Sequence, residues 1–133
     1  MIILDTHALL WLDQDSESLG PGARSTIERA WRTSSVAVVA ISFWECAVLE
    51  QRGRISLPKA PEVWRLELLS SGIREVPLSG ALAILAAGLN DFHKDPADRF
   101  IAAGALAEQA TLLTADQAIL EWSGPLMRQD ARQ

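Results

Sequence analysis

The first twelve residues, MIILDTHALLWL (Met1–Leu12), contain the pattern that decides the fold. Three apolar residues, Ile2–Leu4, form a short run typical of a buried strand, and the leucines that follow have the spacing of a helix. Asp5 stands between these two segments. A short apolar strand followed at once by a helix is the repeating unit of parallel α/β sheets.

The rest of the chain repeats this alternation, without an internal repeat, a low-complexity tract or a long linker. We predict further strands at Val36–Val39, Arg74–Pro77 and Thr111–Leu113, and an edge strand at Pro125–Met127. Further helices are predicted at Ala23–Trp31, Ser42–Gln51, Pro61–Ser71, Leu78–Leu89, Pro96–Gln109 and Asp116–Trp122. The helix that begins at Pro96 is rich in alanine and glycine, which predicts that it lies close against the sheet. Together these segments predict one α/β domain over residues 1–133 with a central, mostly parallel sheet.

Composition excludes several classes of protein. The chain has 133 residues, 49% of them hydrophobic and 22% charged, which is typical of a folded domain and not of a disordered one. Cys46 is the only cysteine, so no intrachain disulfide or cysteine-rich zinc site is expected, and we predict a packing role for it. No signal peptide and no membrane-spanning run is recognised, so we expect a soluble, cytoplasmic protein.

The formal net charge of −5 argues against a simple basic nucleic-acid-binding module. It does not exclude a metal-dependent nuclease, because divalent cations offset the charge of carboxylates in such a site.

Acidic residues follow the predicted strands at four well-separated points. These are Asp5, Glu45, Asp98 (with Asp95 just before it) and Asp116. Strand ends of one polarity share one edge of a parallel sheet, and ligands of such sheets bind outside the carboxyl ends. Each acid also has a simpler explanation as a helix cap, and Ser42 and Glu45 have the spacing of a capping box. Four independent helix caps would meet at one edge by chance much less often than a single cap would occur there. We therefore predict that these acidic residues form a site at this edge.

A site made mainly of carboxylates suits Mg²⁺ or Mn²⁺, because both ions prefer oxygen ligands. We predict that Asp5, Asp98 and Asp116 hold the principal ion, and that Glu45 positions the ion and its water or acts as general base.

For the other polar residues, a role in the acidic site and an ordinary structural role both stay open. Thr6 and Thr114 either support the carboxylates with their hydroxyls, or cap the first helix and end a strand. Arg99 either approaches a substrate phosphate, pairs with an acid or points away. His7 and His93 either touch substrate or are ordinary histidines at a helix start and in a loop.

Four segments of the sequence, in order and spacing, resemble PIN-domain ribonucleases, and more narrowly the VapC toxins of type II toxin–antitoxin pairs. They are Leu4-Asp5-Thr6-His7, Ser42-Phe43-Trp44-Glu45, Asp95-Pro96-Ala97-Asp98-Arg99-Phe100-Ile101-Ala102-Ala103 and Leu112-Leu113-Thr114-Ala115-Asp116. The resemblance implies a parallel three-layer α/β/α sandwich and endonucleolytic cleavage of RNA by metal-activated water. It implies that Asp5, Glu45, Asp98 and Asp116 are the pocket carboxylates, and that Asp95 and Thr114 occupy positions common beside them. His7 departs from the asparagine or serine frequent at its position.

The same resemblance implies a homodimer and a cognate antitoxin whose C-terminal segment occupies the pocket. Trp44, Leu49, Val63 and Trp64 are candidates for the dimer or antitoxin surface, with the core as the alternative.

Three other functions stay open at this point. The chain could be a catalytically silent PIN-fold interaction module, or a metal-dependent nuclease or phosphatase that acts on DNA or another phosphoester. A receiver-type phosphorylation switch is disfavoured, because Lys59 and Lys94 fall in loops far from the place where that chemistry needs a lysine.

Overall fold

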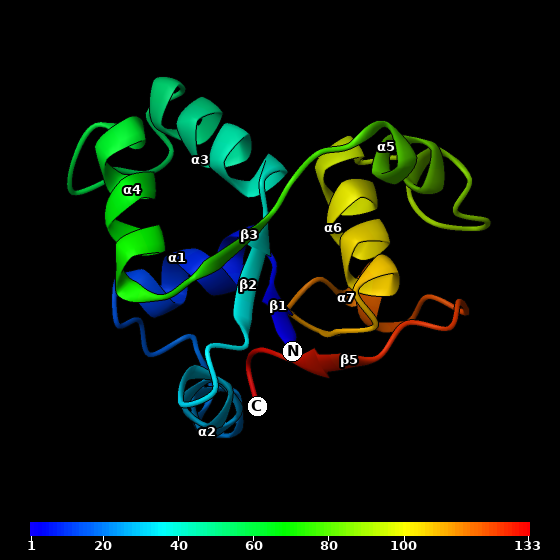
Figure 1. Ribbon diagram of the computed structural model, residues 1–133, viewed down its shortest axis with the longest axis horizontal. Coiled ribbons are helices and arrows are strands. Elements are labelled where there is room, and N and C mark those ends of the chain that lie inside the picture. Colours follow the sequence, from blue (N-terminus) through cyan, green and yellow to red (C-terminus); the bar gives the residue numbers. More distant parts are fainter.

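The computed structural model describes residues 1–133, with a five-stranded sheet between two layers of helices (Figure 1). The strands are β1 (Ile2–Leu4), β2 (Val36–Val39), β3 (Arg74–Val76), β4 (Thr111–Thr114) and β5 (Arg128–Asp130). Their order in the sheet is β3-β2-β1-β4-β5, and every neighbouring pair is parallel. The α/β prediction is therefore confirmed, and the sheet is wholly parallel.

The central strands are buried on both faces. In the register of the sheet, Ile3 of β1 stands between Ala37 of β2 and Leu112 of β4, and none of the three is exposed. A strand covered on both faces needs an uninterrupted apolar run instead of an alternating one, which explains the sequences of β1 and β2.

The helices divide between the two faces of the sheet. One layer contains α1 (Thr6–Asp13), α2 (Pro21–Trp31) and α4 (Pro61–Ser71), and the other contains α5 (Gly80–Ala87), α6 (Pro96–Ala107) and α7 (Gln117–Leu120). The remaining helix, α3 (Ile41–Gln51), begins directly after β2 and contacts α1 and α4 on one side and α6 on the other. Side chains of successive strand residues enter alternate cores: Leu4 packs in the first layer, whereas Ile3 packs in the second. This is the three-layer α/β/α sandwich that the resemblance implied.

Close packing of α6 on the sheet confirms the prediction from its small residues. A Cβ atom built on Gly104 would lie 2.5 Å from Cγ2 of the buried Val39. Only a residue without a side chain fits this crossing of helix and strand.

Some predicted boundaries were wrong. The edge strand is Arg128–Asp130 and not Pro125–Met127, because Leu126 turns into the core and the ladder with β4 begins where Leu112 donates to the carbonyl of Met127. The capping box at Ser42 does not form, because α3 already begins at Ile41 and Ser42 is buried.

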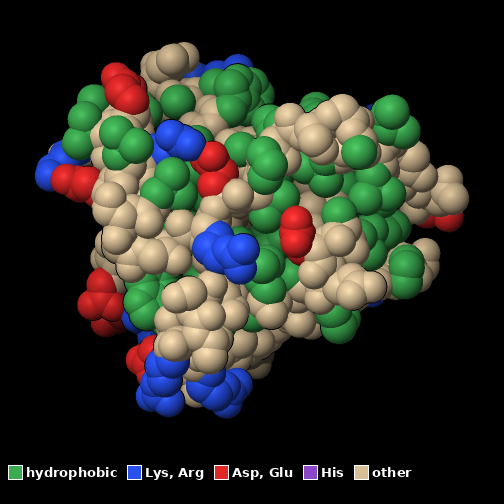
Figure 2. All heavy atoms as spheres, in the orientation of Figure 1, with side chains coloured by type: hydrophobic (Ala, Val, Ile, Leu, Met, Phe, Trp, Pro, Cys, Tyr) green, Lys and Arg blue, Asp and Glu red, His purple; other side chains and the backbone are tan.

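The middle helices contribute to both core and surface. Trp64 is core, with its indole Nε1 donating to Asp13, whereas Trp44 is 58% exposed and Val63 is also exposed. A second exposed apolar group lies in the region of α5, where Figure 2 shows hydrophobic side chains gathered on the surface and where Ile84 is 77% exposed. None of the helices combines the length and the apolar composition needed to cross a membrane.

Candidate active site

A cavity of about 380 Å³ opens beyond the carboxyl ends of β1 and β4. Its walls are formed by Asp5, His7, Trp11, Glu45, Asp95, Asp98, Ala115 and Asp116. From β1 the chain runs outward through β2 to β3, and then returns to the other side of β1 as β4. The cavity therefore lies at the topological switch point, where parallel α/β sheets bind their ligands. All four carboxylates predicted from the sequence line it, together with Asp95.

Asp5 directly follows β1 and is the N-cap of α1, with only 4% of its surface exposed. Its Oδ1 accepts a hydrogen bond of 2.8 Å from the backbone N–H of Ala8, and its Oδ2 accepts one of 2.5 Å from the Thr114 hydroxyl. Burial raises the pKa of the Asp5 carboxyl, and the hydrogen bond from Thr114 opposes that rise. These bonds fix the orientation of the carboxylate.

Thr114 connects the two strand ends of the site. Besides donating to Asp5, its Oγ1 accepts a hydrogen bond of 3.0 Å from the backbone N–H of Asp116. Asp116 in turn caps α7, with Oδ1 accepting from the N–H of Ile119. One buried hydroxyl thus sets the relative position of two carboxylates that are far apart in the sequence.

Thr6 does not cap α1, which was the simpler of its two predicted roles. Asp5 is the cap, and the Thr6 hydroxyl donates to Oγ of Ser42 across 3.0 Å of buried space. This bond ties the start of α1 to the start of α3, and so connects the N-cap Asp5 with the helix from which Glu45 reaches the cavity.

Asp98 lies in the first turn of α6, where Asp95 is the N-cap and accepts from the N–H of Asp98. Burial, followed by the charges of Asp95 and Asp116, raises the pKa of Asp98 to about 8, and Glu45 and Asp5 contribute in the same direction. All four other cavity acids therefore act on Asp98, which indicates how closely they converge.

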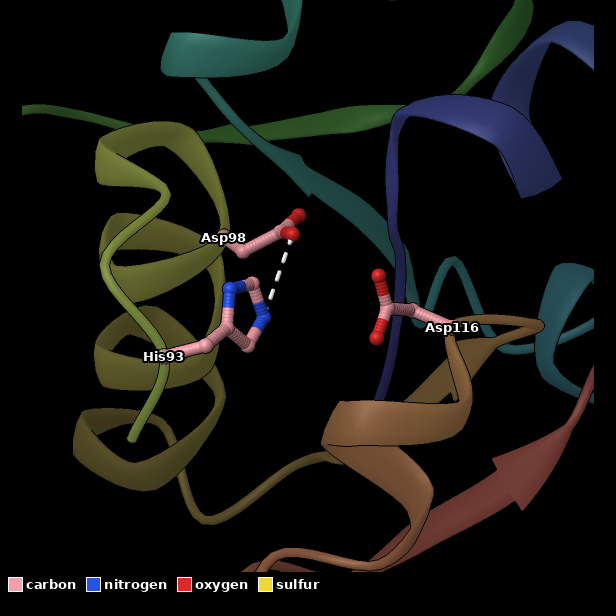
Figure 3. A group of neighbouring side chains, drawn as sticks. All are labelled: His93, Asp98 and Asp116. Atoms are coloured by element: carbon pink, nitrogen blue, oxygen red, sulfur yellow. Dashed lines mark ion pairs between the residues drawn. The ribbon is translucent and has the colours of Figure 1, made fainter. Parts of the chain in front are cut away.

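A histidine lies close to two of these carboxylates. Nε2 of His93 lies 3.3 Å from Oδ2 of Asp98, and His93, Asp98 and Asp116 each offer one ligand atom within 4.8 Å of the others (Figure 3). Imidazole nitrogen and carboxylate oxygens at this separation fit a divalent cation. The cavity walls contain no lysine or arginine that could neutralise the acids, so the donor set and the charge both suit a bound metal ion.

Arg99 has a structural use and does not approach the cavity. Its guanidinium donates to backbone carbonyls at the end of α5 and in the loop that follows, namely those of Ala86, Ala87, Leu89, Phe92 and His93. Cys46 is fully buried and its pKa is raised to about 12, chiefly by burial, so it packs, as predicted, and does not act as a nucleophile.

Trp11 is a residue of the cavity wall that was not predicted from the sequence. The available signal was its spacing: Trp11 follows His7 by four residues, which places both on one face of α1. Ser42 was assigned to a cap and not to the buried bond with Thr6. The role of His93 depends on the path of its loop, which no local pattern predicts.

Comparison with known proteins agrees with this geometry. The sequence model of the PIN domain matches residues 2–123. The chain belongs to the PIN-domain family.

Two kinds of relative support this membership. Over 117 residues, the chain is 34% identical to Ribonuclease VapC22 of Mycobacterium tuberculosis (strain ATCC 25618 / H37Rv), with 87% of each chain covered. Its PIN fold is similar to that of a toxin–antitoxin complex from Klebsiella pneumoniae (TM-score 0.65, 18% identity, 98% of each chain covered). It is also similar to VapBC2 from Rickettsia felis bound to a DNA fragment from its promoter (TM-score 0.69, 18% identity, 97% of this chain and 98% of the other).

Proposed function

We propose that this PIN domain, which we take to span residues 1–133, is a metal-dependent endoribonuclease and the toxin of a toxin–antitoxin pair. The observation that carries the proposal is the convergence of five carboxylates on one cavity at the switch point of the sheet. The relative named Ribonuclease VapC22 supports RNA as the substrate class.

The charge of the cavity supports the need for a cation. Five of the 17 acidic side chains line the cavity, and the other 12 equal the lysines and arginines in number. The five cavity acids therefore account for the whole formal net charge of −5. A phosphodiester is itself an anion, and without a cation it would be repelled from such a cavity. A bound Mg²⁺ or Mn²⁺ would neutralise this charge, lower the pKa of a water molecule and stabilise the leaving oxygen.

The residues of the cavity divide the remaining work. Asp98 and Asp116 would hold the cation, and Asp5, fixed by Thr114, would complete the carboxylate wall. Glu45, which reaches the cavity from α3, would accept the proton of the attacking water. Thr6, through Ser42, would keep the element that carries Glu45 in register with Asp5.

The proposed function includes protein partners. The toxin–antitoxin complex from Klebsiella pneumoniae supports an antitoxin partner for this chain. The exposed apolar side chains Trp44, Val63 and Ile84 supply surface for a homodimer and for an antitoxin. A toxin that degrades cellular RNA would act in the cytoplasm. Light scattering after gel filtration would test the dimer, with an expected mass about twice the 14.5 kDa of the chain.

The test of the activity is cleavage of end-labelled single-stranded RNA by the purified protein with Mn²⁺ or Mg²⁺. We expect Asp116→Asn to reduce cleavage about 100-fold or more, because it removes a charged ligand. Asp91→Asn makes the same chemical change at an exposed acid outside the cavity and should cleave like the wild type. Cleavage that survives both a chelator and Asp116→Asn would refute the proposal. Preferential cleavage of single-stranded DNA of the same sequence would replace RNA by DNA as the substrate.

A further inference from the structure

His93 belongs to the loop between α5 and α6, and this loop is held in place from several sides. Its ring stacks on Phe92, with ring centroids 4.7 Å apart and planes inclined by 19°. Phe92 in turn meets the edge of Trp122, whose Nε1 donates to the carbonyl of Asn90. Arg99 donates to the carbonyls of both Phe92 and His93. The imidazole is therefore held in a fixed orientation beside Asp98, a residue of the cavity wall.

The atom that His93 presents has no hydrogen-bond partner. Nε2 is buried, and although it lies 3.3 Å from Oδ2 of Asp98, the two atoms do not form a hydrogen bond of acceptable geometry. A buried polar nitrogen without a partner is costly, and in native proteins it usually marks a bond to something else.

The surroundings of this nitrogen match a metal ligand sphere. Its neighbours are the carboxylates of Asp98 and Asp116, and the three ligand atoms lie within 4.8 Å of one another (Figure 3). Ligands of one six-coordinate ion, each about 2.1 Å from the metal, lie about 3 to 4.2 Å apart. Small side-chain rotations would bring the three atoms to these separations.

We infer that Nε2 of His93 is a ligand of the catalytic cation, and that this nitrogen makes the site bind a transition-metal ion such as Mn²⁺ in preference to Mg²⁺. The inference rests on the proposed function for the presence of a cation. Mg²⁺ takes oxygen ligands and gives up its water reluctantly, whereas imidazole nitrogen is a common ligand of transition metals. A site made of carboxylates alone would discriminate less between the two ions.

The direct test uses Mn²⁺ as a paramagnetic probe of its own ligands. Electron spin echo spectroscopy of the Mn²⁺-loaded protein should show the modulation that a coordinated imidazole nitrogen produces. The chain has only two histidines, so the assignment needs two variants. The modulation should disappear in His93→Gln and persist in His7→Gln, which changes the other histidine near the cavity.

Binding measurements supply a second readout. We expect His93→Gln to weaken Mn²⁺ binding about 10- to 100-fold, as is typical for the loss of a metal-site residue, and Mg²⁺ binding less than about threefold. Circular dichroism would establish that the variant is folded, and His93→Asn would replace it if it is not.

The outcomes separate this inference from the proposed function. If Mn²⁺ binds and supports RNA cleavage but shows no nitrogen coupling, or if the coupling persists in His93→Gln, His93 is not a ligand and the ribonuclease proposal stands. An equal loss of Mn²⁺ and Mg²⁺ affinity in His93→Gln would also overturn the inferred preference. If the wild type neither binds Mn²⁺ nor cleaves RNA with any divalent cation, both proposals fail.

Discussion

Replacing Asp98 by asparagine should stabilise the metal-free protein while it weakens metal binding. The pKa of Asp98 is raised to about 8 by burial and by the neighbouring acids, whereas the same carboxyl in the unfolded chain has its ordinary value of 3.8. At a pH between these two pKa values, Asp98 holds a proton in the native state and has released it in the unfolded chain. The stability of the wild type therefore falls as the pH rises from about 4 to about 8. Asparagine resembles the protonated carboxyl in shape and has no charge to lose.

The size of the effect follows from the shift. Each pH unit in this window removes at most about 1.4 kcal/mol, so the full shift sets an upper limit of about 6 kcal/mol. The side chain of Asp98 is 18% exposed, and water and relaxation of the protein reduce such energies. We therefore expect Asp98→Asn to gain about 1–3 kcal/mol at pH 8. For a chain of this length that raises Tm by about 3–10 °C.

The assay is thermal unfolding followed by circular dichroism, in EDTA, at pH 5 and at pH 8. The gain should be small at pH 5 and largest at pH 8, whereas Asp91→Asn should show no gain at either pH. Addition of Mn²⁺ should reverse the order, because binding stabilises the wild type more than the variant. A variant that is no more stable than the wild type at pH 8 in EDTA would refute the idea that the cavity acids repel one another.

Three further perturbations test the same site and its support. Mn²⁺ should bind the wild type more tightly as the pH rises from 6 to 8, by at most about tenfold per pH unit, because Asp98 must lose its proton for the ion to bind. Calorimetry in two buffers would detect the proton that is released. An Mn²⁺ affinity that does not change with pH would contradict this prediction. Thr114→Val keeps the methyl group but leaves Asp5 without its hydroxyl donor, and it should cost about 1–3 kcal/mol in urea unfolding as well as Mn²⁺ affinity. Thr114→Ser keeps the hydroxyl and should keep most of that affinity. Unchanged Mn²⁺ affinity in Thr114→Val would contradict the role of the hydroxyl. Gly104→Ala forces a Cβ atom against Val39, which should cost about 1–3 kcal/mol, whereas the higher helix propensity of alanine contributes at most about 1 kcal/mol. Urea unfolding should therefore show a net loss of stability. A variant as stable as the wild type would show that the helix can shift at no cost.

The sequence predicted those features that follow from strand polarity. Asp5 and Asp116 come after β1 and β4, and parallel strands leave no choice about the edge at which such residues meet. The close approach of α6 to the sheet was equally predictable, because a glycine among alanines in a helix indicates close packing against a neighbouring element. Both predictions depend only on the element and its direction, and not on how a loop turns.

Features that depend on a side chain's choice among partners were not predictable. Arg99 stands beside Asp98 in the sequence, yet its guanidinium binds the carbonyls at the end of α5, because a loop that returns to α6 brings them within reach. The bond from Thr6 to Ser42 likewise needs two helix starts to meet in space. The edge strand was misplaced by a few residues, since nothing local fixes where Leu126 turns inward.

The helix-cap explanation and the site explanation of the acids turn out to be compatible. Asp5, Asp95 and Asp116 each accept a backbone N–H of the helix that they cap through Oδ1, and all three line the cavity. A cap occupies only part of the acceptor capacity of a carboxylate, so the same side chain can start a helix and face a ligand. Capping also holds each of these carboxylates in one orientation before any cation arrives.

Asp98 differs from these three because its carboxylate caps nothing. It lies in the first turn of α6 and its carboxylate receives no backbone donor, while the other cavity acids surround it. The proton that relieves the crowding is therefore held at Asp98, the carboxylate next to Nε2 of His93. A divalent cation that displaces this proton would remove the repulsion at the position where it is greatest. The fold therefore fixes three of the five cavity carboxylates by caps and leaves Asp98 to be neutralised by a proton or by a metal, so that metal binding and stability are coupled through Asp98.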